Sequence, residues 1–176
     1  ALVNRGLRVG AFKCGPDYID PMFHSRIIGA KSANLDLHFF SENILRYLFA
    51  KNAADRDVSI IEGVMGYYDG LGLTSTKASS YEVAQVTDSP VVLVVNAKGA
   101  SLSVLAVIQG FLNFAPKSNI RGVLLNQCSP MAYSALSRAI EERLGVACYG
   151  YLPKMENCSL ESRHLGLVTA DEVADL

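Results

Sequence analysis

The sequence predicts an α/β fold with a doubly wound, mostly parallel sheet. Short runs rich in β-branched residues alternate along the chain with segments whose apolar residues recur at helical spacing. Each short run is continuously apolar, a pattern typical of parallel strands that are buried on both faces. Half of the 176 residues are hydrophobic, so the chain can bury a sizeable core within one domain.

The chain begins with features of a helix end followed by a strand. Residues 1–5 resemble the last turn of a helix that Gly6 terminates. We therefore expect further chain before Ala1, containing a strand, a loop and most of a helix. The first strand is predicted at residues 7–12. Residues 13–40 carry a charged loop and a Gly-Ala-Lys turn, but no predicted helix or strand.

Helices and strands alternate over the rest of the chain. Strands are predicted at residues 58–61, 91–95, 120–125 and 146–151. Helices are predicted over residues 44–49, 102–114 and 131–144, and over a short segment that ends near residue 86. Ser41 would cap the first of these in the chain, Ser79 or Ser80 would cap the short one, and Gly145 would end the last. A further helix is expected to begin near Thr169.

Polar residues gather where the predicted strands end. They are Lys13, Asp17, Asp20, Glu62, Asp69, Asn96, Lys98 and Asn126, and Pro153 closes the last predicted strand. In open parallel sheets, ligands bind outside the carboxyl ends of the strands. Because scattered surface charge would not collect at one edge of the sheet, this pattern predicts a binding site there.

The acids and the lysine in this set suit phosphate chemistry. Two carboxylates about 4 Å apart repel by roughly 4 kcal/mol at an effective dielectric near 20. The cation Lys13 and the acids Asp17 and Asp20 are therefore expected to meet something charged, such as a divalent metal, a phosphate or an ammonium. Glu62 before Gly63 has the layout of a magnesium-binding acid, and Asp17 could be a second ligand. Lys13 could neutralise a phosphate in transfer. A solvated loop with a surface ion pair remains the alternative.

Other roles stay open from the residues alone. Glu62 could instead cap a helix or form a salt bridge. Asn126 could hydrogen-bond an adenine edge, but a turn-forming role fits its position better. A phosphate-binding loop of the G-x-x-x-x-G-K-[ST] type does not occur in the sequence. We expect that loop in the chain that precedes Ala1.

Composition narrows the class of protein. The net charge of −1 offers no basic surface for nucleic acid. The four cysteines are scattered without a C-x-x-C pair, which predicts reduced thiols in a cytoplasmic protein. No apolar run approaches the roughly 18 residues of a membrane span, and no signal peptide is visible.

Several motifs together resemble the cobyrinic acid a,c-diamide synthase family. The longest are KCGPDYIDP at residues 13–21, followed by His24, and EGVMGYYDG at residues 62–70. Shorter matches, in the family's order, are NLD at 34–36, PVVLVV at 90–95, GVLLN at 122–126 and RHLGL at 163–167. The chain is similar, more distantly, to dethiobiotin synthetases. The resemblance implies a P-loop NTPase type of fold that lacks its first strand and phosphate loop.

The resemblance implies ATP- and Mg²⁺-dependent amidation of the a and c acetates of a corrinoid through an acyl phosphate. It assigns catalysis to Lys13, Asp20 and Asp69, metal binding to Asp17 and Glu62, nucleotide binding to Asn126 and Pro153, and corrinoid contacts to Tyr18, His24 and Tyr68. Residues 1–176 would form the synthetase domain, truncated at its start. A glutaminase domain, absent from this sequence, would supply the ammonia.

Departures from the family pattern set further expectations. Asn96 stands where relatives usually carry Asp, which leaves a metal or ribose role at that position in doubt. The missing first strand would lie between the strands that end at Glu62 and Val95. The resulting gap would cost several kcal/mol, by analogy with large cavities. We therefore expect the chain alone to be inactive, and either marginally stable or paired with another chain as a homodimer.

Three other functions remain open on the sequence. The first is an amidoligase for another tetrapyrrole, such as nickel-sirohydrochlorin. The second is a partition-type ATPase switch that binds a protein partner, and the third is a non-enzymatic remnant. Asp20 and Asp69 favour an amidoligase, because a switch needs no acids beyond its metal ligands.

Overall fold

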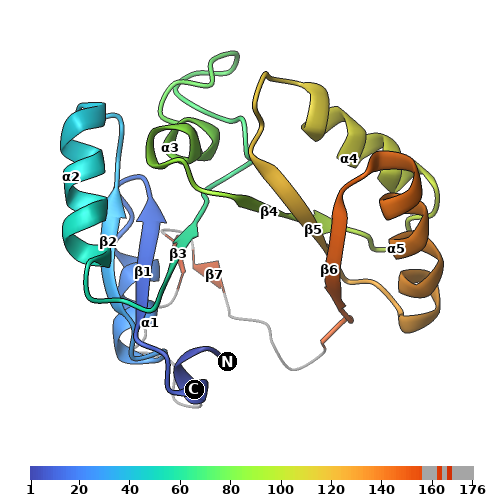
Figure 1. Cartoon of the computed structure of the whole chain (residues 1–176), viewed down its shortest axis with the longest axis horizontal. Helices are drawn as coiled ribbons and strands as arrows, with labels where there is room; N and C mark the ends of the chain where they lie inside the picture. The colour runs from blue at the N-terminus through green and yellow to red at the C-terminus, as the bar shows by residue number, and fades with distance from the viewer. Residues whose placement is uncertain (156–161, 164–165, 168–176) are drawn as a thin grey trace. The chain divides into compact units, whose positions relative to one another are not determined.

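The computed structural model describes residues 1–155, 162–163 and 166–167 (Figure 1). The fold is α/β, as predicted, and its six longer strands form two parallel three-stranded sheets. The chain divides into two compact units, with the boundary between Thr87 and Asp88. No helix among the described residues combines the length and the apolar character needed to cross a bilayer.

The first unit contains a sheet with the strand order β2-β1-β3. Its elements are η1 (Val3–Arg5), β1 (Val9–Cys14), α1 (Ile19–Arg26), β2 (Lys31–Leu35), α2 (Glu42–Ala53), β3 (Val58–Glu62) and α3 (Ser80–Thr87). A short antiparallel pair, β7 (Ser162–Arg163) and β8 (Gly166–Leu167), belongs to the same unit. In the parallel register, Lys13 lies opposite both Asn34 and Glu62.

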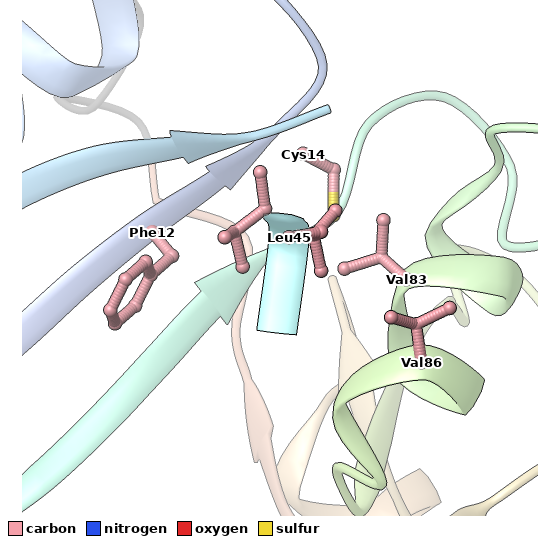
Figure 2. Close-up of a cluster of buried hydrophobic side chains, with 6 residues drawn as sticks. Phe12, Cys14, Leu45, Val83 and Val86 are labelled. Carbon is pink, nitrogen blue, oxygen red and sulfur yellow. The ribbon is translucent and has the colours of Figure 1, made fainter. Parts of the chain in front are cut away.

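The core of the first unit lies on one face of β1. Phe12 and Cys14 pack there against Leu45 of α2 and Val83 of α3, and Figure 2 shows these side chains converging. Val9 and Ala11, which point to the opposite face of β1, form a second buried cluster with Ala30. β1 is therefore buried on both faces, as the continuous apolar pattern predicts.

The second unit contains a sheet with the strand order β4-β5-β6. Its elements are β4 (Val91–Asn96), α4 (Ser103–Asn113), β5 (Ile120–Asn126), α5 (Pro130–Leu144) and β6 (Ala147–Leu152). The Ser129 hydroxyl accepts a hydrogen bond from the Ala132 amide at 3.2 Å and so caps α5. Gly145 ends that helix in the left-handed conformation, with φ of 63°.

Two elements of the first unit were not predicted. Residues 13–40, expected as loops and a turn, contain the helix α1 and the strand β2. α1 has no continuous apolar stripe and carries Pro21 in its first turn, where proline is tolerated. β2 is short and mixes polar with apolar residues, and its pairing with β1 in the folded chain is what makes it a strand.

The expectation of strands buried on both faces is wrong for β3 and β4. Ile60 of β3 is 48% exposed, and Val92 and Val94 of β4 are 49% and 61% exposed. The exposed residues alternate along each strand and therefore share one face of it. Each of these two strands also lies at the edge of its own sheet. β3 and β4 are also the two strands between which the sequence predicts a missing strand.

The structure describes the first residues of the chain but only part of the segment after residue 155. The predicted helix end at residues 1–5 is the short 3₁₀ helix η1, and Gly6 ends it with φ of 81°. The helix expected near Thr169 lies outside the described residues, as do His164 and Leu165 of the RHLGL motif. Cys14, Cys128 and Cys148 are free thiols, as predicted, and all three are buried, while Cys158 lies outside the described residues.

Candidate functional site

The site in the first unit is centred on Lys13, near the carboxyl end of β1. Its side chain is only 5% exposed, and its ammonium nitrogen lies 2.5 Å from Asp20 Oδ2 and 3.2 Å from Glu62 Oε1. A buried cation is costly unless it is paired, and these two carboxylates supply the pairing. Burial alone would lower the pKa of Lys13, but its hydrogen bonds to Asp20 and Glu62 outweigh burial and raise it. Lys13 therefore remains an ammonium at neutral pH.

Asp17 and α1 hold Asp20 in place. Asp17 Oδ1 accepts hydrogen bonds from the backbone amides of Ile19 at 2.8 Å and Asp20 at 3.4 Å. Asp17 thereby caps the start of α1, where a negative charge is favoured by the helix dipole. The Asn34 side chain donates to the carbonyls of Gly15 and Asp17 and so ties the loop to β2.

Glu62 links two elements at the carboxyl end of β3. One of its oxygens contacts Lys13, and the other lies 2.7 Å from His24 Nε2. The opposite ring nitrogen of His24 lies 3.1 Å from the Ser32 hydroxyl. The side chain of Glu62 is 45% exposed, whereas that of His24 is 12% exposed. Glu62 is therefore both anchored and accessible to a ligand.

The loop after β3 forms a separate arrangement. Asp69 Oδ2 accepts a hydrogen bond from the Gly66 amide at 2.9 Å, which closes a tight turn within the loop. The Tyr68 ring packs against those of Tyr67 and Tyr81, with centroid distances of 4.8 Å and 5.1 Å. Burial is the main cause that raises the pKa of Tyr67 above its usual range, so its phenol stays protonated at neutral pH.

The nucleotide-binding candidates lie in the second unit. Asn126 ends β5, and its side-chain oxygen accepts a hydrogen bond from the adjacent Gln127 amide at 3.0 Å. Asn96 ends β4 and accepts in the same way from the Lys98 amide at 3.1 Å. Pro153 follows directly after β6. These local contacts match the turn-forming role considered for Asn126.

The structure thus joins four of the predicted residues directly: Lys13, Asp20, His24 and Glu62. Asp17 supports them through the cap of α1, while Asp69 and Tyr68 lie in the separate loop arrangement. Tyr18, next to Asp17, is 71% exposed and free to meet a ligand from solution. Among the described residues, no group of three or more His, Cys, Asp or Glu is arranged to hold a metal ion.

Three further residues belong to this edge of the sheet although no role was predicted for them individually. Ser32 holds His24, and Asn34 holds the loop after β1. Asp36 follows β2 and is 4% exposed, and within the described part of the chain its Oδ2 has no hydrogen-bond partner. Alternation along β2 could have suggested that Ser32 and Asn34 share a face, but β2 itself was not predicted.

Cys14, beside Lys13, is a core residue with no nucleophilic character. It is 2% exposed and packs in the apolar cluster of the first unit. Burial is the main cause that raises the pKa of the Cys14 thiol to about 11. Because a thiol, unlike a thiolate, is a poor nucleophile, Cys14 contributes packing to the site.

Comparison with known proteins identifies relatives along the whole chain. The cobyrinate a,c-diamide synthase of Clostridium acetobutylicum is 46% identical over 178 residues, covering 100% of this chain and 40% of the relative. That of Listeria monocytogenes is 44% identical, with 100% of this chain and 39% of the relative covered. That of Priestia megaterium is 38% identical, with 100% and 38% covered.

These matches confirm the resemblance read from the motifs. No family model matches the chain. The chain spans about two fifths of the length of the curated relatives it matches.

Proposed function

We propose that this chain, which matches cobyrinate a,c-diamide synthases over its whole length, carries the carboxylate-activating part of such a ligase. The reaction would be the ATP-dependent amidation of the a and c acetates of cobyrinic acid in cobalamin biosynthesis. The buried Lys13 ammonium, held between Asp20 and Glu62 where two parallel strands end, is the observation that carries the proposal.

The proposed chemistry has two steps. An oxygen of the substrate carboxylate attacks the γ-phosphorus of ATP, and the bond from that phosphorus to ADP breaks, which gives an acyl phosphate. Ammonia then attacks the acyl carbon, phosphate leaves with the bonding electrons, and the nitrogen loses a proton to give the amide. Lys13 would stabilise the negative charge on the transferring phosphoryl group, which is the main task of an enzyme in phosphoryl transfer.

The charge of the Lys13 cluster bears on the need for a metal ion. One ammonium and the two carboxylates of Asp20 and Glu62 sum to −1, which on its own would repel a polyphosphate. Mg²⁺ binds through one or two carboxylates together with phosphate and water, so a large set of protein ligands is unnecessary. The donor chemistry at this strand edge therefore fits Mg²⁺.

Glu62 and Asp17 are the proposed ligands. A carboxylate offers about four lone-pair positions, and Glu62 uses one on each oxygen for Lys13 and His24. Asp17 engages Oδ1 with backbone amides, so its second oxygen would serve the cation. When bound, Mg²⁺ would neutralise phosphate charge and orient the γ-phosphate.

The remaining roles complete the proposal. Asp69, in the exposed loop after β3, would capture ammonium and accept its proton before attack, with Asp20 nearer the substrate carboxylate. Tyr18 and Tyr68 would contact the corrinoid, and Asn126 and Pro153 would contact the adenine. The ammonia would come from glutamine, hydrolysed by a glutaminase domain. Buried free thiols support a reducing, cytoplasmic setting.

A hybrid enzyme tests this proposal. Residues 1–176 would replace the matching segment of the Clostridium acetobutylicum synthase, and ATP-dependent amidation would be followed by mass spectrometry with ammonium chloride or glutamine as nitrogen source. We expect cobyrinic acid mono- and diamide, with one ADP per amide. A folded hybrid that makes no amide, beside an active parent enzyme, would overturn the proposal. Amidation of nickel-sirohydrochlorin instead would identify the alternative substrate.

A second experiment tests Glu62 in the same hybrid. Glu62→Gln keeps the size of the side chain but removes the charge that would hold Mg²⁺. We expect Mg²⁺-dependent turnover to be abolished while the protein still folds. Unchanged rates would refute the metal-binding role of Glu62.

A further inference from the structure

A chain of hydrogen bonds from β2 through α1 to β3 ends on the candidate metal ligand. Ser32 Oγ lies 3.1 Å from His24 Nδ1, and His24 Nε2 lies 2.7 Å from Glu62 Oε2. Three separate elements therefore contribute to the position of one carboxylate. His24 is 12% exposed, which leaves little of its ring for contact with a ligand.

The direction of these hydrogen bonds follows from the donors available. An ionised carboxylate only accepts, so His24 Nε2 must carry the hydrogen that Glu62 receives. In the neutral imidazole, Nδ1 is then the acceptor, and the Ser32 hydroxyl is its donor. Ser32 thus favours the one neutral form of His24 that can donate to Glu62.

The contact with His24 is the shorter of the two that hold Glu62. Its distance is 2.7 Å, against 3.2 Å from Lys13 to the other oxygen. Lys13 itself has a closer partner in Asp20, at 2.5 Å. Since the Glu62 side chain is 45% exposed and has three rotatable bonds, loss of the His24 contact would release it toward solvent.

We propose that His24 is a positioning residue, which Ser32 holds in the donating form and which fixes the Glu62 carboxylate beside Lys13 with its remaining lone pairs directed outward. This inference replaces the corrinoid contact expected of His24, and its consequence for Mg²⁺ rests on the proposed function. Partners of metal ligands typically change metal affinity or activity by about 10–100-fold when they are removed.

The hydrogen-bond chain can be tested on the chain as it stands, without any assay of activity. Nitrogen-15 NMR of the imidazole at one mildly alkaline pH reports which ring nitrogen carries the hydrogen. We expect His24 to carry it on Nε2, and Ser32→Ala and Glu62→Gln each to shift its signals. His38, which packs on the Phe39 ring, is the internal control and should not respond. A hydrogen on Nδ1 of His24, or His24 ring-nitrogen signals that stay unchanged in both variants, would overturn the proposal.

A matched pair of substitutions tests the positioning role in the hybrid enzyme. The amide nitrogen of Gln can reach the place of Nε2 and donate to Glu62, whereas that of Asn reaches only the place of Nδ1. We expect His24→Asn to raise the Mg²⁺ concentration for half-maximal rate by about 10–100-fold with a smaller change in kcat, and His24→Gln to restore most of the affinity. Equal behaviour of the two variants would overturn the proposal.

The two experiments separate this inference from the proposed function. If the unsubstituted hybrid makes no amide, the proposed function fails, while the NMR measurement still decides whether Ser32 and Glu62 fix His24.

Discussion

Lys13 and Glu62 lie directly opposite each other in the parallel register of β1 and β3, and their side chains meet at 3.2 Å. The two strands end together, so a buried cation and a half-exposed anion share one edge of the sheet. Lys13 is also held by Asp20 from α1. Charge balance at Lys13 is therefore a property on which the stability of this edge of the sheet depends, and the proposed function rests on the same three side chains.

Removal of the Lys13 charge should destabilise the first unit. Lys13→Met leaves Asp20 and Glu62 facing each other without a cation, and breaking a buried pair costs about 3–5 kcal/mol. Because Asp20 and Glu62 are 21% and 45% exposed, water will offset part of that cost. We expect the free energy of unfolding, measured in urea, to fall by about 1–3 kcal/mol.

The double variant Lys13→Met with Asp20→Asn is the control for this effect. It removes one negative charge along with the positive one, so it should regain part of the lost stability without regaining amidation in the hybrid enzyme. Equal stability of the single variant and the parent chain would show that the pairing contributes nothing.

Asp69→Asn should separate nucleotide binding from amidation in the hybrid enzyme. The Asp69 carboxylate accepts only one described backbone hydrogen bond, from Gly66, and an Asn oxygen can accept the same bond. The turn should therefore survive, while proton removal from ammonium is lost. We expect amidation with ammonium chloride to fall about 10²–10⁴-fold, the usual contribution of a general base, with the Kd of ATP unchanged. Loss of ATP binding as well would mean that Asp69 has a different role.

The strands and their polar ends could be predicted because they depend on local pattern. Continuous apolar runs identified β1 and β3. Because parallel strands present their carboxyl ends at one edge of a sheet, the sequence alone predicts that Lys13 and Glu62 lie close together. α1 and β2 could not be found in this way, because the polar strand β2 owes its form to pairing with β1. The role of Ser32 depends on β2 and was hidden for the same reason.

The exposed apolar side chains of β3 and β4 show a second limit of pattern reading. A continuous apolar run predicts a strand that is buried on both faces, yet Val94 is 61% exposed. That β4 is an edge strand follows only from the strand order of the folded sheet. Asn126 shows a third, because a turn contact to Gln127 and a contact with adenine use the same residue type at the same place. The hydrogen bond to Gln127 is local to the turn, so it fits either role of Asn126.

The Cys14 thiol should make stability depend on pH in the alkaline range. Its pKa rises from 9.0 to about 11 on folding, because burial disfavours the thiolate. The contribution is fully present below pH 9 and is lost as the pH rises through 11, amounting to roughly 3 kcal/mol at about 1.4 kcal/mol per unit of pKa. Cys14→Ala, which has no thiol to titrate, is the control for every other group in the chain.

The measurement for Cys14 is urea unfolding at a series of pH values for both proteins. The free energy of unfolding of the parent chain should fall more steeply above pH 9 than that of Cys14→Ala. In the native state the thiol should also react with iodoacetamide far more slowly than after unfolding. Parallel pH curves for the two proteins would contradict the raised pKa.

Gly70→Ala should disrupt the loop after β3. A Cβ at this position would lie 2.3 Å from the carbonyl oxygen of Lys77 and 2.6 Å from that of Ser75, and neither backbone atom can move without opening the loop. We expect the free energy of unfolding, measured by heat or urea, to fall by about 1–3 kcal/mol. Gly110→Ala is the matched control: it lies within α4 with open space around it, and should stabilise the chain by about 0.5–1 kcal/mol. A harmless Gly70→Ala would show that the loop has room to rearrange.

The exposed face of β4 should drive self-association of the chain. Val92 and Val94 are 49% and 61% exposed on an edge strand, and unprotected apolar edge strands are templates for pairing with another chain. We expect light scattering coupled to size exclusion to show a mass that rises with concentration, and Val94→Lys to return it to that of a monomer. Val107→Lys is the matched control, because Val107 is 50% exposed but lies on the helix α4 and not on a strand. A monomer with one cooperative thermal transition at every concentration would rule out this pairing.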